Sequence, residues 1–368
     1  MHERPAMAHA STVDTIALRP EPCRPPPIPR RPASTCPEGD TLAAESKVGE
    51  WRVASELGRG GMASVHAVTH AEFGKRAALK IAHRSALSGA YTPDVFLREA
   101  RVVHAVAHPG VIDVFATGMH DDRPYLVMER LAGATLGRMV DTAPLPRAEG
   151  LAILIELVDI LRATHAAGVV HRDLKLDNVF VLAEPYARDR RVKLLDWGVA
   201  HVLGQDDPFR GLIAGTLTYV APEQIRGGAL TGAADIYSLA VLAYHVLCRR
   251  PPFAAANDLA LVHLHLRAEP PRASTAWSSI PPALDALLFD MLAKVPAQRP
   301  TLDEIERVLR ETLALLAPAP PPEPPQPEPM PQLDVLGRPA LTFPPFHAGW
   351  IGLAVAIAGY CCLMSALP

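Results

Sequence analysis

The chain has 368 residues, a formal net charge of −3 and 49% hydrophobic residues, so it can bury one large core or two modest ones. The near-neutral balance and the lack of a basic stripe argue against a nucleic-acid partner. The cysteines have no metal-ligand spacing, which is typical of a cytoplasmic protein with reduced thiols. They are Cys23, Cys36, Cys248, Cys361 and Cys362.

Residues 1–48 are rich in Pro, Arg and Ser and show no apolar periodicity. Because such a segment cannot bury enough surface to offset the entropy of ordering, we expect a disordered tail. The run Pro25-Pro26-Pro27 could attract a polyproline-binding partner or could simply belong to this tail. Met1 is followed by a charged, proline-rich stretch, so no signal peptide is predicted.

A glycine-rich turn is predicted between two strands, Trp51–Leu57 and Val65–Thr69. Glycines let backbone N–H groups approach phosphate oxygens without a Cβ in the way. By itself such a cluster could also be an ordinary hairpin. The turn and its flanks comprise Leu57, Gly58, Arg59, Gly60, Gly61, Met62, Ala63, Ser64 and Val65.

Two charged residues follow in apolar surroundings. Lys80 is the single lysine of the predicted strand Ala77–Ile81, where a lysine often serves only to keep an edge strand soluble. A helix is predicted from Thr92, a good cap, and Glu99 shares the face of its apolar stripe. A carboxylate facing a core is costly unless paired, so we expect a Lys80–Glu99 ion pair; the alternative is a glutamate that reaches solvent. The stripe comprises Phe96, Ala100, Val103 and Ala107.

Residues 171–180 read His-Arg-Asp-Leu-Lys-Leu-Asp-Asn-Val-Phe and place an acid, a base and an amide at spacings that suit phosphoryl transfer. These groups are Asp173, Lys175 and Asn178. Further along, the predicted strand Val192–Leu195 runs into Asp196-Trp197-Gly198, where a buried indole N–H would need a partner.

In this order, the motifs resemble those of bacterial Hanks-type (eukaryotic-like) serine/threonine protein kinases from Trp51 to about Leu316. The resemblance implies an α+β, two-lobed protein-kinase-like fold over residues 51–316. Its small lobe, about 51–128, would be mainly antiparallel sheet plus the Glu99 helix. Its large lobe, about 132–316, would be mainly helical, with core helices at 151–165 and 236–247.

The resemblance also implies roles for these residues around ATP and Mg²⁺ or Mn²⁺. The turn from Leu57 to Val65 would cover the phosphates, and the hinge at Glu129 and Leu131 would bind adenine through its backbone. The resemblance implies one residue for each remaining role. Lys80 would contact the α- and β-phosphates, Glu99 would hold Lys80, Asp173 would orient the substrate hydroxyl, Lys175 would neutralise the γ-phosphate, Asn178 and Asp196 would bind the metal, and Thr216 would bond to Asp173 and Lys175.

Two further positions complete the resemblance. Asp235 would brace the catalytic loop, and Arg299 would pair with Glu223 at the end of the activation segment. The segment between Asp196 and Thr216 has no Ser, Thr or Tyr, although Arg172 sits where related kinases grip a phosphorylated residue. We therefore expect either that Asp206 or Asp207 supplies the anion permanently, or that self-association orders the loop; alternatively, the acidic pair is merely solvated and Arg172 is structural.

Three departures leave other functions open. Ala63 replaces a family glycine and should narrow the turn slightly, Trp197 replaces a phenylalanine, and the activation segment lacks a hydroxyl. These features would suit a pseudokinase, a scaffold that keeps the fold without catalysis. Retention of Lys80, Asp173 and the other charged positions favours an active enzyme acting on protein substrates, itself included, over this alternative and over a small-molecule kinase.

Beyond the predicted domain, residues 317–347 are expected to form a proline-rich spacer. Residues 348–367 contain no charge and are long enough to cross a bilayer, so a single transmembrane helix is predicted, with a core helix as the alternative. Trp350 and Tyr360 are candidate interface anchors. The expected location is the inner (cell) membrane, single-pass, with the kinase domain in the cytoplasm. The four-residue spacing of small residues in this span would allow a homodimer, although small residues are common in spans anyway.

Overall fold

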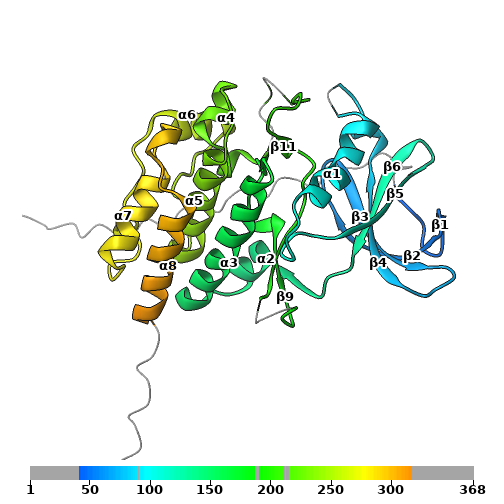
Figure 1. The fold of residues 1–368 in the computed structure, drawn as a ribbon, viewed down its shortest axis with the longest axis horizontal. Helices are drawn as coiled ribbons and strands as arrows, with labels where there is room; N and C mark the ends of the chain where they lie inside the picture. The colour runs from blue at the N-terminus through cyan, green and yellow to red at the C-terminus, as the bar shows by residue number, and fades with distance from the viewer. Residues whose placement is uncertain (1–40, 90, 187–189, 210–211, 213–214, 317–368) are drawn as a thin grey trace, which may run out of the picture. The chain divides into compact units, whose positions relative to one another are not determined.

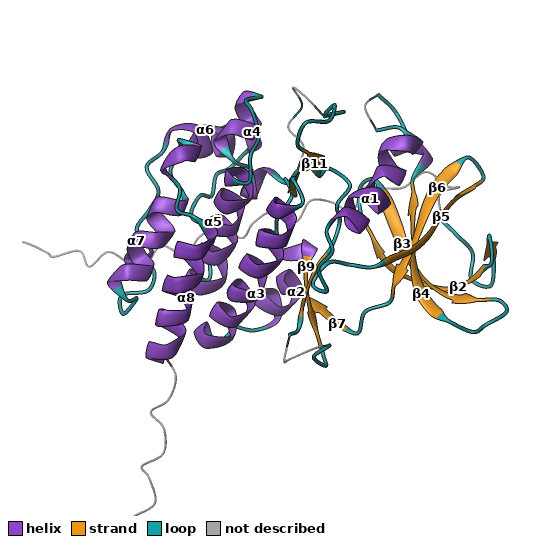
Figure 2. Cartoon of the chain, in the orientation of Figure 1, coloured by secondary structure: helices purple, strands orange, loops and turns teal. Residues whose placement is uncertain are grey.

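The computed structural model describes residues 41–316 except 90, 187–189, 210, 211, 213 and 214. The predicted tail up to residue 40, the proline-rich spacer and the predicted membrane span lie outside the described residues. Figure 2 shows two lobes, one built on an orange sheet and the other on purple helices. The α+β, two-lobed architecture expected from the sequence is therefore present.

The small lobe is an antiparallel six-stranded sheet in the order β1-β2-β3-β4-β6-β5. Buried and exposed residues alternate at the start of β2, as expected for a strand with one face on a core. A core of Val48, Trp51, Val53, Leu79 and Tyr125 with neighbouring apolar residues covers part of the sheet. The strands are β1 (Lys47–Val48), β2 (Trp51–Arg59), β3 (Ala63–His70), β4 (Arg76–Ala82), β5 (Val114–His120) and β6 (Arg123–Glu129).

Helix α1 (Pro93–Ala105) packs against β5 and β6 and faces the large lobe (Figure 1). Thr92 caps it as predicted, because its side chain accepts a hydrogen bond from the Val95 N–H. Phe96 and Glu99 are buried on its inner face. The predicted stripe is wrong at its last position, since the helix ends at Ala105 and Ala107 is exposed.

The start of the sheet corrects one boundary. Residues 47 and 48 were expected to belong to the disordered tail, but they form β1, which pairs with β2. Val48 is fully buried beside Trp51, so two residues gain enough apolar contact to order the chain ahead of β2. The glycine-rich turn is also shorter than predicted, because β2 continues to Arg59 and β3 begins at Ala63.

The large lobe is built around α3 (Arg147–Ala166) and α5 (Ala233–Cys248), which pack on each other and cover both predicted core helices. Every residue of α5 from Ala234 to Tyr244 is buried, as expected for a helix that is apolar on all sides. The surrounding helices are α2 (Leu136–Thr142), α4 (Pro222–Arg226), α6 (Asp258–Arg267), α7 (Pro282–Met291) and α8 (Leu302–Leu316).

Short strand pairs position the loops that carry the motifs. β7 (Gly133–Thr135), β9 (Val179–Leu182) and β10 (Val192–Leu194) form one small sheet, and β8 (Val169–Val170) pairs with β11 (His201–Val202). The catalytic-loop motif thus runs from β8 to β9, and Asp196 follows β10. Within the part of the chain that the structure describes, no helix has the length and apolar character needed to cross a membrane.

Candidate active site

Three segments far apart in the sequence meet at the ammonium of Lys80. Its Nζ lies 2.7 and 3.0 Å from the two carboxylate oxygens of Glu99, and 2.8 Å from Oδ1 of Asp196. Lys80 comes from β4, Glu99 from α1 and Asp196 from the loop after β10. The predicted Lys80–Glu99 ion pair is present, and the solvent-facing alternative for Glu99 is wrong because this residue is 4% exposed.

The shared ammonium sets the charge states of this cluster. Desolvation alone would raise the pKa of Asp196, but the attraction of Lys80 outweighs it and lowers the pKa to about 2. Desolvation would likewise lower the pKa of Lys80, but the two carboxylates raise it. Burial raises the pKa of Glu99, which lies deepest and shares its cation with Asp196. Asp196 therefore stays ionised at neutral pH, and its side chain is 42% exposed and so accessible to a cation.

Asp173 is the centre of the catalytic loop. Its Oδ2 accepts hydrogen bonds from Lys175 Nζ at 2.6 Å and from Asn178 Nδ2 at 3.1 Å. Its Oδ1 accepts from both the backbone N–H of Thr216, at 2.8 Å, and the hydroxyl of the same residue, at 3.0 Å. The predicted contact of Thr216 with Asp173 is present, whereas no hydrogen bond joins Thr216 to Lys175 among the described residues.

The backbone of this loop is held in an uncommon conformation. Arg172 has φ +69°, in the left-handed region that a side chain rarely adopts. Asp235, fully buried on α5, accepts the backbone N–H groups of both His171 and Arg172 at 2.9 Å. Gln224 donates to the Arg172 carbonyl at 3.0 Å. Asp235 thus braces the loop as expected, and Gln224 is an additional brace.

The metal-side segment packs beneath the catalytic loop. Trp197 is 1% exposed, and its ring lies edge-on to that of His171 at 4.6 Å between centroids. Its indole N–H donates to the Leu194 carbonyl at 3.3 Å, so the expected partner exists. The Leu195 N–H donates to the Asn178 carbonyl at 2.8 Å, which places Asn178 next to the strand that ends at Asp196.

The glycine-rich turn is exposed from Leu57 to Met62. A Cβ added at Gly58 or at Gly61 would meet no atom within 4 Å, and neither residue has positive φ. Folding therefore does not require glycine at these two positions, whereas close approach of a phosphate to the backbone would. Arg59 is turned toward Glu56, with which it forms an ion pair.

The rest of the predicted turn belongs to β3. Ala63 has a buried methyl group and ordinary backbone angles, so it does not narrow the turn as expected. The Ser64 side chain is also buried, with its hydroxyl 2.9 Å from His66 Nε2, which leaves only its backbone for a ligand. Val65 is half-buried directly across from Lys80 in the sheet.

At the hinge, Glu129 is held by its side chain and its backbone. Its carboxylate binds Lys193 Nζ and accepts the Asp113 N–H at 2.9 Å, and its own N–H donates to the Asp113 carbonyl. Leu131, the second hinge position, is partly buried against the hydrophobic cluster that includes residues of both lobes. Lys193 was not among the predicted site residues, although a lysine within the apolar strand Val192–Leu195 was a signal that could have revealed it.

Glu223 and Arg299 form a bidentate ion pair in the large lobe, with N···O distances of 2.6 and 2.8 Å. Both side chains are buried, and Arg299 also donates to the Ala233 and Ala293 carbonyls. Two buried charges are stable only when they are paired and their remaining polar atoms are hydrogen-bonded, as they are here. The pair anticipated from the sequence therefore anchors the end of the activation segment to the helical core.

The model of the family described as "Protein kinase domain" matches residues 51–309. The chain belongs to the protein kinase family. Its relatives include the serine/threonine-protein kinase Pkn1 of Myxococcus xanthus, 37% identical over 255 residues, which cover 69% of this chain and 36% of Pkn1. Serine/threonine-protein kinase PknB of Mycolicibacterium smegmatis is 31% identical, over 66% of this chain and 39% of PknB. The chain thus spans little more than a third of the length of these two relatives.

Solved structures agree with the family. The crystal structure of a double-mutant form of the Mycobacterium tuberculosis PknI kinase domain has a TM-score of 0.59 and 26% identity to this chain. The match covers 74% of this chain and 99% of the PknI chain. A protein kinase fold therefore accounts for both lobes described above.

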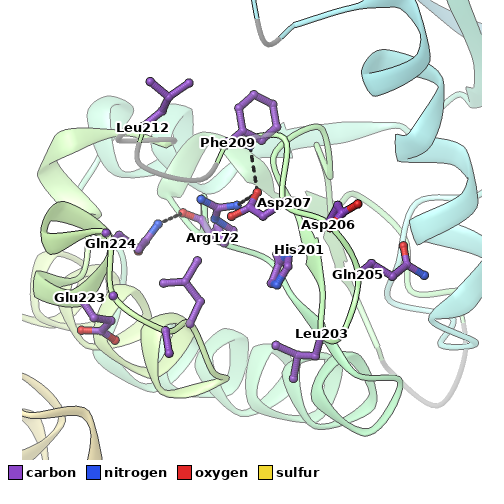
Figure 3. A pocket seen from close by; sticks show the side chains of 15 residues that line it. Arg172, His201, Leu203, Gln205, Asp206, Asp207, Phe209, Leu212, Glu223 and Gln224 are labelled. Carbon is purple, nitrogen blue, oxygen red and sulfur yellow. Dashed lines mark hydrogen bonds and ion pairs between the residues drawn. The ribbon is translucent and has the colours of Figure 1, made fainter.

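A cavity of about 590 Å³ lies beside the activation segment of this kinase domain (Figure 3). It is lined by Arg172, by residues 203–207 and by residues 227–230, among others. None of the predicted nucleotide or metal residues lines it. This cavity is consequently separate from the cluster around Lys80 and borders the contact between Arg172 and Asp207.

Proposed function

We propose that this chain is a serine/threonine protein kinase that transfers the γ-phosphate of ATP to hydroxyl groups of protein substrates, including its own. The observation that carries the proposal is the convergence of Lys80, Glu99 and Asp196 next to a catalytic loop in which Asp173 contacts Lys175 and Asn178. This arrangement supplies fixed charges where a phosphoryl group would be transferred.

Asp173 would receive the reacting hydroxyl. The substrate oxygen attacks the γ-phosphorus, the bond from this phosphorus to the bridging oxygen of ADP breaks, and the hydroxyl proton passes to the Asp173 carboxylate. Lys175, 2.6 Å from this carboxylate, would offset the charge of the transferred group. Thr216 holds the other carboxylate oxygen, which fixes the direction in which Asp173 can accept the proton.

Lys80 would bind the α- and β-phosphates, since its ammonium is already oriented by Glu99. The bare backbone at Gly58, Gly60 and Gly61 would cover the phosphates, and the backbone at Glu129 and Leu131 would bind adenine. We assign the last two contacts from the family pattern and from the exposure of the turn.

Asn178 and Asp196 would hold Mg²⁺ or Mn²⁺. Both offer oxygen donors, which suit these hard cations, and they lie on adjacent segments joined by the Leu195–Asn178 hydrogen bond. The Asn178 amide nitrogen is used by Asp173, so its oxygen is the atom left to face a cation. When bound, the metal neutralises charge on the phosphates; the residues here orient it.

Transfer of labelled γ-phosphate tests the proposal. Wild-type protein should label itself or a generic protein at Ser and Thr, and Asp173→Asn should lose at least about 100-fold of this activity, in line with losing a general base. The matched control is Asp177→Asn in the same loop, an exposed residue outside the proposed machinery. Equal labelling by wild type and Asp173→Asn would instead support the pseudokinase alternative, and label on metabolites alone would support a small-molecule kinase.

We also propose that residues 348–367 tether the domain to the inner membrane with the kinase domain in the cytoplasm, as a single-pass protein that could pair into a homodimer. Support comes from the uncharged 20-residue composition of this stretch. In fractionated cells the full chain should sediment with membranes and resist alkaline extraction, whereas a chain ending at residue 316 should not. Recovery of the full chain in the soluble fraction would overturn this proposal.

A further inference from the structure

The cation next to the catalytic aspartate is buried and needs an anion. Arg172 immediately precedes Asp173, and its side chain is 3% exposed. Its Nη1 lies 2.8 Å from Oδ1 of Asp207, a residue of the activation segment. Because an unpaired buried charge is strongly unfavourable, this contact ties the loop that holds Asp173 to the segment that carries Asp207.

The contact is built by the surrounding backbone. Strand β11 pairs with β8, two residues before Arg172, and the Leu203 N–H donates to the Gly168 carbonyl at 2.8 Å. Asp207 is oriented in turn, since its Oδ1 also accepts the Phe209 N–H at 3.0 Å (Figure 3). The segment therefore reaches Arg172 from a paired strand with its carboxylate already aimed.

The neighbouring acidic residue, Asp206, makes a different contact. The Asp206 side chain is exposed, and the backbone carbonyl of this residue accepts a hydrogen bond from Arg98 Nη1 at 3.4 Å. Arg98 is the residue before Glu99 on α1. The same short stretch thus contacts the catalytic loop through Asp207 and the helix that orients Lys80 through the backbone of Asp206.

The far end of the segment is fixed as well. Thr216 bonds to Asp173, and Gln224 bonds to the Arg172 carbonyl. From Trp197 to Gly215 the sequence has no Ser, Thr or Tyr, so no hydroxyl in this stretch can be phosphorylated to provide the anion. The carboxylate of Asp207, by contrast, is encoded in the chain and needs no modification.

We propose that Asp207 is a positioning residue that permanently holds Arg172, and through it Asp173, in the arrangement used for phosphoryl transfer. The domain then needs no phosphate between residues 197 and 215 to become active. This inference rests on the proposed kinase function and specifies how its site is regulated. The Asp207 side chain acts through Arg172 and touches neither nucleotide nor substrate.

Kinetics of conservative variants give the first test. Asp207→Asn keeps the size of the side chain but removes its charge, and it should lower kcat about tenfold while KM for ATP changes less than about twofold. Asp207→Glu should recover part of the lost kcat, and the control Asp206→Asn should match wild type. Wild-type kcat in Asp207→Asn, or an equal loss in Asp206→Asn, would overturn the proposal.

Two measurements separate this proposal from the kinase function and from misfolding. Hydrogen exchange of the nucleotide-free protein should show faster exchange at residues 197–209 in Asp207→Asn, with α3 and α5 unchanged. Phosphatase treatment of the wild-type domain should leave its activity intact. Loss of activity on this treatment would overturn the permanent-anion proposal while supporting the kinase function, and a wild type inactive before treatment would count against the proposed function itself.

Discussion

The catalytic loop and the glycine-rich turn carry the two halves of the proposed chemistry, but the chain holds them in opposite ways. Asp173 and Asn178 are buried, and Asp235 fixes the backbone before them with two hydrogen bonds. The turn from Leu57 to Met62 is exposed: Gly58 and Arg59 pair with Val65 and Ser64 at the end of the sheet, and beyond them the Gly60 N–H donates to the Ala63 carbonyl. The loop is therefore set by protein contacts before a nucleotide arrives, whereas the turn offers bare backbone for the nucleotide to order.

This difference predicts how the two regions respond to mutation. A change that disturbs the catalytic loop should reduce kcat and stability together, because the same buried contacts serve both. A change in the turn should alter nucleotide affinity with little effect on stability, because few contacts there support the fold. Glycine-to-alanine substitutions test this contrast with the smallest available change, one methyl group.

The largest effect is expected at Gly215. This residue has φ +106°, and an added Cβ would lie 2.8 Å from the Arg172 carbonyl oxygen and 3.3 Å from Asp173 Oδ1. Gly215→Ala should therefore displace the catalytic loop and lower kcat about 100-fold, the size expected for a displacement of about 1 Å. Steady-state kinetics would measure the loss, and thermal unfolding should show a lower Tm.

Gly204→Ala is the matched control, because Gly204 lies in the same segment with φ +81° but has open space around an added Cβ. Both variants introduce backbone strain, and only the one at 215 adds a contact with the catalytic loop. If the two variants lost the same activity, strain rather than contact with Arg172 would explain the effect.

Part of this site follows from the sequence by physical reasoning. Helical periodicity placed Glu99 on a buried face, burial demanded a cation, and Lys80 was the one lysine in the neighbouring strand. The covered Trp197 needed a partner for its N–H for the same reason. Such predictions succeed because a buried charged or polar group has few possible hydrogen-bond or ion-pair partners.

Other features depend on backbone direction, which composition does not encode. Asp206 and Asp207 are adjacent and identical in type, and only the course of the loop decides which of them reaches Arg172. Val48 was not predicted to lie in a strand, because β1 has two residues and is too short to show an alternating apolar pattern. The methyl group of Ala63 was expected to narrow the turn, but β3 begins at Ala63, two residues before the predicted strand, and the methyl group is buried.

A smaller effect is expected at the hinge, which lies between the two regions. Lys193 is 7% exposed and binds the Glu129 carboxylate, which also accepts the Asp113 N–H. Lys193→Met should loosen the backbone that is proposed to bind adenine, raising KM for ATP about fivefold, on the order of 1 kcal/mol for one polar contact. Initial rates over a range of ATP concentrations would separate this change from one in kcat.

The double variant Lys193→Met/Glu129→Gln refines this test. If the pair acts as a unit, removing both charges should cost no more than removing Lys193 alone, because Glu129 is no longer left without its cation. Additive losses in the double variant would show that the two side chains influence ATP binding separately.

The smallest effect is expected in the glycine-rich turn. Gly61 does not have positive φ, and there is open space around an added Cβ. Gly61→Ala should therefore leave Tm unchanged or raise it slightly. The free energy of unfolding should rise by up to about 1 kcal/mol, because alanine has less conformational freedom than glycine in the unfolded chain. The same methyl group would stand between the backbone and a phosphate and should raise KM for ATP about threefold. Ala63→Gly, two residues away, should instead lower stability by about 0.5–1 kcal/mol and leave KM unchanged, because it removes a buried methyl group of β3. If Gly61→Ala and Ala63→Gly changed Tm and KM for ATP in the same way, the turn would be held by contacts of the fold, as the catalytic loop is.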